Sequence, residues 1–211
     1  VPTANISSVT YLDVSTKGIT NLTGIEGFIA LTELSCQNNQ LTSLDVSQNI
    51  ALNFLSCYDN QLTDLDVSAN SALIALDCSI NQLTGLDVSQ NTELIELKCF
   101  GNLLTSLDVR NGNNTILGLF DASNNPDLTC IYVEDVSYTT NWGKDPASNF
   151  VTDEAECDAL FTLIPDSNFE LALIELGLDT LPINSSVPTA NISSVTYLDV
   201  STKGITNLTG I

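Results

Sequence analysis

The 211-residue chain is 43% hydrophobic, which is enough to bury a core in one or two domains. It carries 26 acidic residues against five lysines and arginines, a net charge of -21, so we expect no binding to nucleic acid or bare anionic membrane. No apolar run reaches the roughly 18 residues of a membrane span, so we expect no membrane insertion.

Residues 10–30 are an imperfect first member of a series of repeats. Leu12 and Val14 precede Leu34 and Cys36 by 22 residues, and the apolar and polar residues alternate around them. This alternation predicts a short strand in an initial coil. The same alignment places Asp13 opposite a serine of the next coil.

Residues 31–114 hold four consecutive units of 21 residues that share the pattern LxxLxCxxNxLTxLDVSxN. A fixed period of this length predicts a solenoid in which each unit is one coil. The segments LxxLxC and LxxLxV each alternate apolar and polar residues, so we predict two short, inward-facing, parallel strands per coil. One coil buries too few side chains, at roughly 1.5–3 kcal/mol each, to offset the ordering of its backbone at about 1–2 kcal/mol per residue. The coils must therefore stack.

Cysteine and asparagine recur at fixed positions in these units. We interpret the recurring cysteines as small core residues rather than metal ligands or disulfides, because no histidine is present and stacked strands aim the sulfur atoms alike. They are Cys36, Cys57, Cys78 and Cys99. We predict that the asparagines form two ladders that hydrogen-bond the turning backbone of neighbouring coils. The ladders are Asn39, Asn60, Asn81 and Asn102, and Asn49, Asn70 and Asn91.

The LDVS segments place one aspartate per coil on the outside. These are Asp45, Asp66, Asp87 and Asp108. Neighbours about 4.8 Å apart repel by on the order of 1 kcal/mol in water. The favoured explanation is that nearby hydroxyl and backbone groups and solvent offset the repulsion. The alternative is that the row binds calcium or another hard cation.

The outward positions on the cysteine side vary between units, whereas the LDVS side is nearly constant. Exposed apolar groups on a regular scaffold often mark a contact surface, although single surface aromatics are also common. We therefore take the following as candidate binding residues: Phe54, Tyr58, Ile80, Lys98 and Phe100.

After the fourth unit the spacing recurs once more, with alanine in the cysteine slot, and we expect the pattern to stop there. The recurring residues are Leu117, Phe120, Ala122, Asn125 and Leu128. Residues 10–133 resemble the 21-residue, cysteine-bearing repeats of bacterial leucine-rich-repeat surface proteins, the internalin J-like proteins, and especially those of secreted Bacteroidetes proteins. The resemblance implies a leucine-rich-repeat solenoid of short parallel strands, with a short helical N-terminal cap and a disulfide-bonded C-terminal cap.

The segment from Asn124 to Cys157 resembles that closing cap. The resemblance implies a disulfide between Cys130 and Cys157, which would stabilise the cap by ~3 kcal/mol. Disulfides persist in oxidising compartments, so we expect an extracellular or cell-surface location.

Residues 163–180 predict a helix with apolar residues on one face. Ser167 and Glu170 fit a capping box, and Gly177 fits a helix stop. The apolar residues are Phe169, Ala172, Leu173 and Leu176. We interpret this segment as the N-terminal cap of a second module.

Residues 187–211 are identical to residues 1–25 at every position, so the sequence repeats with a period of 186 residues. We predict that EGFIALTELSC follows in the parent polypeptide and that Val1 is a cut through a longer array. The predicted domains are a first module at 1–162, comprising a first coil at 10–30, four repeats at 31–114 and a last coil with cap at 115–162, and the helical cap and first coil of a second module at 163–211.

The chain has no histidine, no GxSxG motif, no phosphate-binding loop and no isolated pair of acids, so we expect no enzyme and no cofactor other than the calcium considered above. The leading hypothesis is a structural or adhesive tandem module of a bacterial surface stalk or extracellular fibre, with other copies of the module as partners. The alternative is a recognition module that binds a glycan or host surface protein through the variable cysteine-side face.

Overall fold

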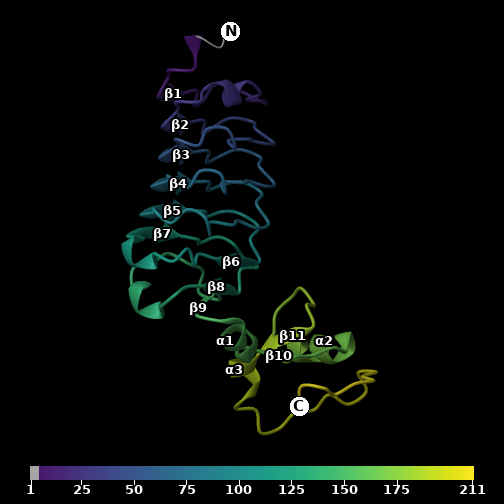
Figure 1. Ribbon diagram of the computed structural model, residues 1–211. Helices are drawn as coiled ribbons and strands as arrows, with labels where there is room; N and C mark the ends of the chain where they lie inside the picture. Colours follow the sequence, from purple (N-terminus) through teal and green to yellow (C-terminus); the bar gives the residue numbers. More distant parts are fainter. Residues whose placement is uncertain (1–4) are drawn as a thin grey trace. The chain divides into compact units, whose positions relative to one another are not determined.

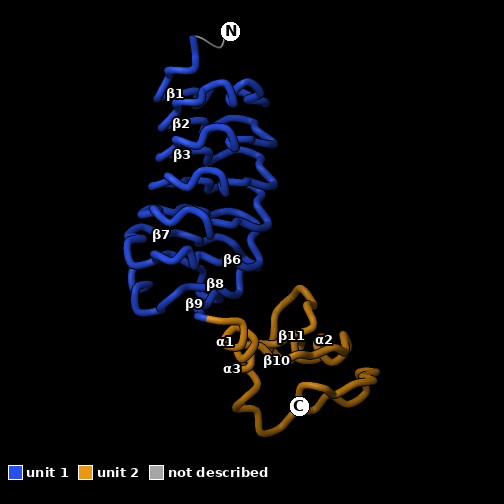
Figure 2. The backbone as a smooth tube through the Cα atoms, in the orientation of Figure 1, with its two compact units in different colours: residues 1–152 blue, residues 153–211 orange. Residues whose placement is uncertain are grey.

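The computed structural model describes residues 5–211 and falls into two compact units, Val1–Thr152 and Asp153–Ile211 (Figure 2). The first unit is a stack of coils, in which each coil lies on the one before (Figure 1). The predicted solenoid is therefore confirmed. The predicted module boundary between residues 162 and 163 concerns the recurrence of the sequence and stays a prediction.

One side of the stack is a six-stranded parallel sheet in the order β1-β2-β3-β4-β5-β7. Its strands are β1 (Tyr11–Asp13), β2 (Glu33–Ser35), β3 (Phe54–Ser56), β4 (Ala75–Asp77), β5 (Glu96–Lys98) and β7 (Leu119–Asp121). The central residue of each strand from β2 to β7 is buried, because alternate side chains point to opposite faces of a strand. Leu12 pairs with Leu34 and Asp13 with Ser35, as the repeat alignment predicts.

The opposite side of the stack corrects the prediction of a second strand in every coil. Leu44 and Val46 are buried as expected, but a strand forms there only late in the stack, as β6 (Ser106–Asp108), which pairs with β8 (Cys130–Tyr132), itself paired with β9 (Asn149–Val151). In the earlier coils the backbone turns instead of forming a ladder. The carbonyl oxygen of Val46 accepts from the Asn49 N–H at 2.9 Å and from the Asn70 amide at 3.1 Å.

The interior confirms both asparagine ladders. The Nδ2 atom of Asn81 donates to the carbonyl oxygens of Cys57 and Cys78, both at 3.1 Å, and its Oδ1 atom accepts from Leu62 N at 3.0 Å. The four cysteines of the repeats are free and buried, which confirms their core placement. Burial raises the pKa of the Cys36 thiol to about 12.

The leucine spacing stops after Leu128, as expected, but the stack of coils continues into the segment that follows. Gly143 N donates to the Phe120 carbonyl at 2.8 Å, and the Trp142 ring lies 4.7 Å from the Phe120 ring. A larger residue here would displace the Asp121 side chain, because an added Cβ would lie 2.6 Å from an Asp121 carboxylate oxygen. Two short 3-10 helices, η3 (Asn114–Ile116) and η4 (Val136–Tyr138), lie in the last coils, and a third, η2 (Ile25–Gly27), lies in the first.

The second unit contains α1 (Glu154–Ala159), β10 (Phe161–Leu163), α2 (Ser167–Glu175), β11 (Ser186–Pro188) and α3 (Thr189–Ile192), with β10 and β11 antiparallel. Helix α2 confirms the predicted helix but corrects its N-cap, and its role as the cap of a second module stays a prediction. Asp166, not Ser167, caps the helix, by accepting from Phe169 N at 3.0 Å. Glu170 instead accepts from the backbone of residues 184 and 185, at 2.5 and 2.8 Å. Gly177, at φ 73°, ends the helix as predicted.

Cys130 and Cys157 are disulfide-bonded, as the family resemblance implies. No helix in the part of the chain that the structure describes is long and apolar enough to cross a membrane.

Candidate functional site

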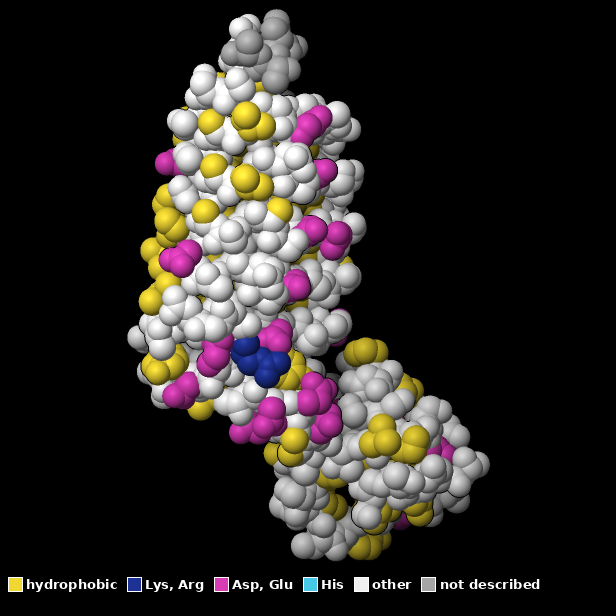
Figure 3. All heavy atoms as spheres, in the orientation of Figure 1, with side chains coloured by type: hydrophobic (Ala, Val, Ile, Leu, Met, Phe, Trp, Pro, Cys, Tyr) yellow, Lys and Arg dark blue, Asp and Glu magenta, His cyan; other side chains and the backbone are white. Residues whose placement is uncertain are grey.

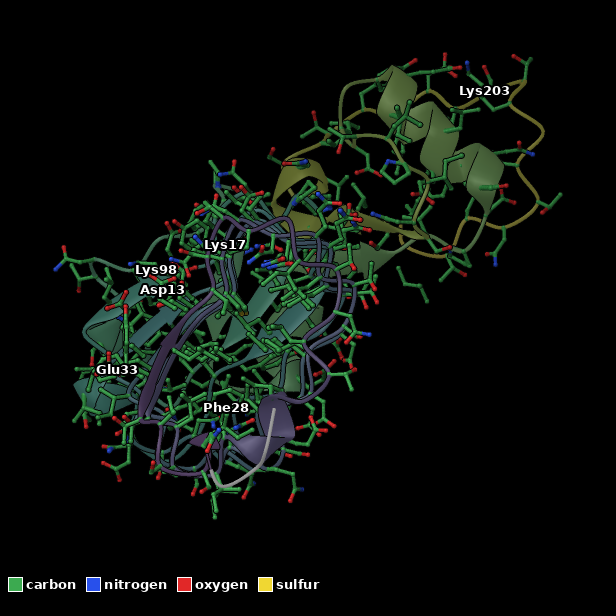
Figure 4. All side chains as sticks on the ribbon, turned by 90° about the horizontal axis from the view of Figure 1, so that it is seen from above. Asp13, Lys17, Phe28, Glu33, Lys98 and Lys203 are labelled. Carbon is green, nitrogen blue, oxygen red and sulfur yellow. The ribbon has the colours of Figure 1, made fainter. Side chains whose placement is uncertain are left out.

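The outward side of the six-stranded parallel sheet is a continuous surface of the first unit, and we call it the sheet face. Each strand contributes its first and third residues, because its second residue points inward. The first-residue column is Tyr11, Glu33, Phe54, Ala75, Glu96 and Leu119, and the third-residue column is Asp13, Ser35, Ser56, Asp77, Lys98 and Asp121. Figure 4, which looks down the stack, shows Asp13, Glu33 and Lys98 on the side that carries the strands.

The sheet face combines negative charge with exposed apolar side chains. Its two columns hold five carboxylates and a single ammonium group. Tyr11, Phe54 and Leu119 are 56%, 45% and 45% exposed. Glu33, Phe54 and Asp77 help to line a shallow hollow of about 240 Å³ across the central strands. The space-filling view in Figure 3 shows acidic side chains spread along the stack and few basic ones.

Lys98 does not neutralise this face. Its Nζ atom donates to Glu96 Oε1 at 2.6 Å, and the strand register places it between Asp77 and Asp121. The hydrogen bond that Lys98 donates to Glu96 raises the pKa of Lys98, and the two aspartates raise it further. Lys98 is therefore charged, but it is already paired with Glu96 within a negative surface.

The structure divides the five predicted binding residues into two groups. Phe54 and Lys98 lie on the sheet face, whereas Tyr58, Ile80 and Phe100 lie in the turns that follow the strands. We call these three residues the edge cluster. Tyr58 and Phe100 are half-buried and occupy equivalent positions in two coils. The coil between them has Ser79 at that position.

Ile80 occupies an unusual backbone position within the edge cluster. Its φ is 52°, in the left-handed region that the equivalent residues Asn38, Asp59 and Asn124 also adopt. A β-branched residue in this region costs roughly 1–3 kcal/mol, so the position favours asparagine, aspartate or glycine. Ile80 is nevertheless 46% exposed, which adds an apolar group to the edge of the sheet face.

Two exposed apolar residues of the sheet face, Tyr11 and Leu119, are missing from the predicted set. Tyr11 belongs to the imperfect first coil, and Leu119 to the coil that carries alanine in the cysteine slot. Aligning these two coils with the repeats would have identified them, because Tyr11 and Leu119 occupy the position that Phe54 has in its own coil.

The outward aspartates of the LDVS segments each form a local turn. Asp45 and Asp66 accept from the backbone N–H groups of Ser47 and Ser68, at 3.0 and 2.9 Å. Hydrogen bonds from the backbone and hydroxyl of Ser47 lower the pKa of Asp45. Asp87 and Asp108 accept in the same way from the backbone N–H groups of Ser89 and Arg110. These hydrogen bonds explain how the four aspartates tolerate their mutual repulsion.

The calcium alternative receives no geometric support from this row. Among residues 5–211, no group of three or more aspartate, glutamate, cysteine or histidine side chains is arranged to hold a metal ion. The outward aspartates Asp45, Asp66, Asp87 and Asp108 are instead bonded to their own turns, so calcium binding there stays an untested prediction.

Comparisons with known proteins place this fold. No protein-family model and no curated protein matches the chain. The functional domain of InlJ from Listeria monocytogenes, which includes a cysteine ladder, is 34% identical with a TM-score of 0.59, over 74% of this chain and 39% of that one. The internalin InlF of Listeria monocytogenes is 19% identical with a TM-score of 0.48, over 71% of this chain and 42% of that one. A leucine-rich-repeat protein of Leptospira interrogans is 22% identical with a TM-score of 0.48, over 67% of this chain and 37% of that one.

The chain therefore spans about two-fifths of the length of these structures. The similarity to the InlJ domain agrees with the column of buried cysteines and the parallel sheet described above. The fold is a leucine-rich-repeat solenoid.

Proposed function

We propose that the chain is an extracellular adhesion module that binds a protein partner through the sheet face. The observation that carries this proposal is the exposure of Tyr11, Phe54 and Leu119 within a field of carboxylates on a rigid sheet. Exposed apolar groups on a fixed scaffold supply the buried centre of an interface, and surrounding charges select the partner.

The charge of the sheet face specifies the chemistry of that partner. Five carboxylates face outward, and Lys98 is already hydrogen-bonded to Glu96. A surface with lysine or arginine side chains around apolar groups complements this arrangement, whereas an acidic surface is repelled. The partner that fits best is a basic protein surface.

The extracellular location of the protein is also part of the proposal, and it is inferred from the disulfide bond. The disulfide of Cys130 and Cys157 favours an oxidising environment. The similarity to the InlJ domain of a bacterium supports a bacterial surface or secreted protein. The finer resemblance to secreted Bacteroidetes proteins rests on the repeat pattern alone.

A second candidate function is a structural segment of a surface stalk or fibre. The observation that favours it is the identity of residues 1–25 with residues 187–211, which indicates modules joined in tandem. In a tandem array, weak contacts of many sheet faces with a surface add up, so the two functions are compatible.

The test of the proposed function compares two matched substitutions of exposed apolar residues. Purified chain is probed against an array of extracellular proteins of acidic to basic isoelectric point and against a glycan array. We expect basic proteins to bind, and Phe54→Ser to weaken their binding about tenfold, as for a typical interface aromatic. Ile50 is 64% exposed outside the sheet, so Ile50→Ser should leave binding unchanged.

Three outcomes would contradict the proposal. Binding to the glycan array alone would assign the sheet face to a carbohydrate. An equal loss in the Ile50→Ser variant would place the interface elsewhere. Binding that does not weaken with added salt would exclude the charge complementarity.

A further inference from the structure

The hollow on the sheet face lies across β2 to β5, in the middle of the stack of coils. Short outward side chains line it together with longer ones. The short residues are Ser35, Ser56 and Ala75, and the longer ones include Glu33, Phe54 and Asp77. Its volume is about 240 Å³. Pockets for drug-sized ligands measure roughly 300–1,000 Å³, so this hollow has room for one side chain of a partner and not for a larger ligand.

The hollow is present because one repeat has alanine at a position that is large in other coils. The strand register places Ala75 between Phe54 and Glu96 in the first-residue column. Neighbouring strands lie about 4.8 Å apart, so the backbones of the two flanking residues are separated by roughly 10 Å, with only a methyl group between them. The same column holds Tyr11 and Leu119 in other coils. Space for a ligand is therefore specific to the coil of Ala75.

The hollow brings an exposed ring together with carboxylates that form no ion pair. Phe54 is 45% exposed. Among the residues that the structure describes, neither Glu33 nor Asp77 belongs to an ion pair. The Oδ1 atom of Asp77 accepts from Ser79 N at 3.1 Å, which holds this carboxylate in place. The hollow thus offers two negative charges beside an aromatic ring.

Elsewhere in the first unit the same combination of ring and carboxylate already holds a cation. The guanidinium carbon of Arg110 lies 5.1 Å from the centre of the Tyr132 ring. Its Nε and Nη2 atoms donate to the two carboxylate oxygens of Asp108, at 2.9 and 2.6 Å. A planar guanidinium stacks on a ring and binds a carboxylate through two hydrogen bonds at once, whereas an ammonium group acts as a point charge.

We propose that the hollow binds one arginine side chain of a protein partner, with the guanidinium against the Phe54 ring and close to the carboxylates of Glu33 and Asp77. This inference rests on the proposed function of the sheet face, and it names the group that the face recognises. Stacking on an exposed ring and pairing with an exposed carboxylate are each weak in water, but here both act on one group.

A neutral sugar is the other ligand that stacks on an exposed ring, and the charges disfavour it. A sugar in the hollow would displace water from the carboxylates of Glu33 and Asp77 without supplying a positive charge. A guanidinium displaces the same water and compensates the charge. The negative charge of the hollow therefore favours arginine.

Lys98 opposes the binding of a cation and so limits its strength. The register places Lys98 between Asp77 and Asp121, and its ammonium group donates to Glu96 Oε1 at 2.6 Å. Figure 4 shows Lys98 on the same side of the stack as Glu33. Removal of this positive charge should strengthen the attraction for arginine, a gain that damage to the fold cannot produce.

The test titrates small probes into the full, isotope-labelled chain, and the chemical shifts of the backbone amides report where each probe binds. The probes are N-acetyl-arginine methylamide, its lysine analogue and its citrulline analogue, which has the shape of arginine without the charge. We expect a dissociation constant in the millimolar range for arginine, binding at least about threefold weaker for lysine, and none for citrulline. The shifts should centre on Phe54, Ala75 and Asp77.

One pair of variants tests the shape of the hollow. Ala75→Leu fills it with the residue that the same column has at Leu119, so the fold should tolerate the change. It should weaken arginine binding about fivefold or more, because the guanidinium no longer reaches the ring. Gly85→Leu adds the same side chain on the LDVS side of that coil, where an added Cβ meets nothing within 4 Å, and should leave binding unchanged.

Two further pairs test the charge of the hollow. Asp77→Asn should weaken arginine binding about two- to five-fold, whereas Asp64→Asn, which removes an exposed charge on the LDVS side, should not. Lys98→Gln should strengthen binding about two- to five-fold, whereas Lys17→Gln, which removes an exposed charge outside the hollow, should not. Thermal melts that match the unaltered chain verify that each variant is folded.

Four results would overturn the inference. They are citrulline or lysine that binds as tightly as arginine, shifts spread evenly over the LDVS aspartates, unchanged affinity in Ala75→Leu, and methyl glucoside that shifts the amides of the hollow when arginine does not. The proposed function fails separately from this inference. If basic proteins bind and Phe54→Ser weakens them but the arginine probe does not bind, only this inference fails. If the probe binds and no protein does, only the proposed function fails.

Discussion

Removal of one buried asparagine side chain from the middle of the first asparagine ladder should strongly destabilise the stack. Asn81 is 8% exposed, and its amide bonds the backbone of Cys78 in its own coil and of Cys57 and Leu62 in the preceding coil. In Asn81→Ala the Leu62 N–H loses its partner inside the stack, whereas the Cys57 and Cys78 carbonyl oxygens each keep one hydrogen bond, from Asn60 and Asn102. The unpaired N–H costs about 1–3 kcal/mol and each lost carbonyl hydrogen bond about 0.5–1.5 kcal/mol, so we expect a loss of about 3 kcal/mol in the free energy of unfolding.

The matched control is Asn53→Ala. Asn53 is half-buried, and its side chain donates one hydrogen bond, to the Ala72 carbonyl at 2.9 Å, so we expect a loss of about 1 kcal/mol or less. Urea unfolding followed by circular dichroism measures both variants, and amide hydrogen exchange at Leu62 localises the effect, because solenoids can unfold in parts. Equal losses in the two variants, with unchanged exchange at Leu62, would refute the reasoning.

Three further predictions concern thiols, a glycine and an acid. Because burial raises the pKa of Cys36 above that of an unfolded thiol, the unfolded state loses protons first, and stability should fall from about pH 9 upward in a pH series of thermal melts; a flat profile would contradict this. Gly143→Ala should destabilise the last coils by about 1–3 kcal/mol and shift tryptophan emission to the red, whereas Gly85→Ala, whose Cβ meets nothing within 4 Å, should be neutral. The hydrogen bonds from Thr206 lower the pKa of Asp166, so the second unit should lose stability as the pH falls below about 4, and Asp166→Asn should remove that acid dependence in urea titrations.

The repeat pattern predicts the sheet and the interior correctly, because both are formed by residues that recur at the same positions of every 21-residue unit. Leucine and cysteine alternate where the backbone forms β2 to β5, and the asparagines bond the carbonyl groups nearest to them in the stack. Burial alone does not predict a ladder, however. Val46 is buried, yet no strand forms in its coil, where the Val46 carbonyl oxygen accepts from Asn49 and Asn70.

The remaining errors arise where distant residues compete with a local pattern. Glu170 fits a capping box by spacing, but it binds the backbone of a segment 14 residues later. The coil of Trp142 lacks the leucine pattern and is held by ring packing and the backbone of Gly143.

The candidate site was only partly predictable, for a related reason. Period-two alternation identifies Phe54 and Lys98 as outward, but it does not show where the strand ends. The left-handed turn that includes Ile80 places the edge cluster beside the sheet face and not on it.

Native-state hydrogen exchange tests the central claim, the in-register stacking of the coils, most directly. Cys57 N donates to the Asp77 carbonyl at 2.8 Å, and Cys78 N donates to the Lys98 carbonyl at 2.9 Å. We predict that both amides exchange slowly and together, because they open only when the central coils separate. Exchange at either amide as fast as at the exposed Ser71 would contradict the stack.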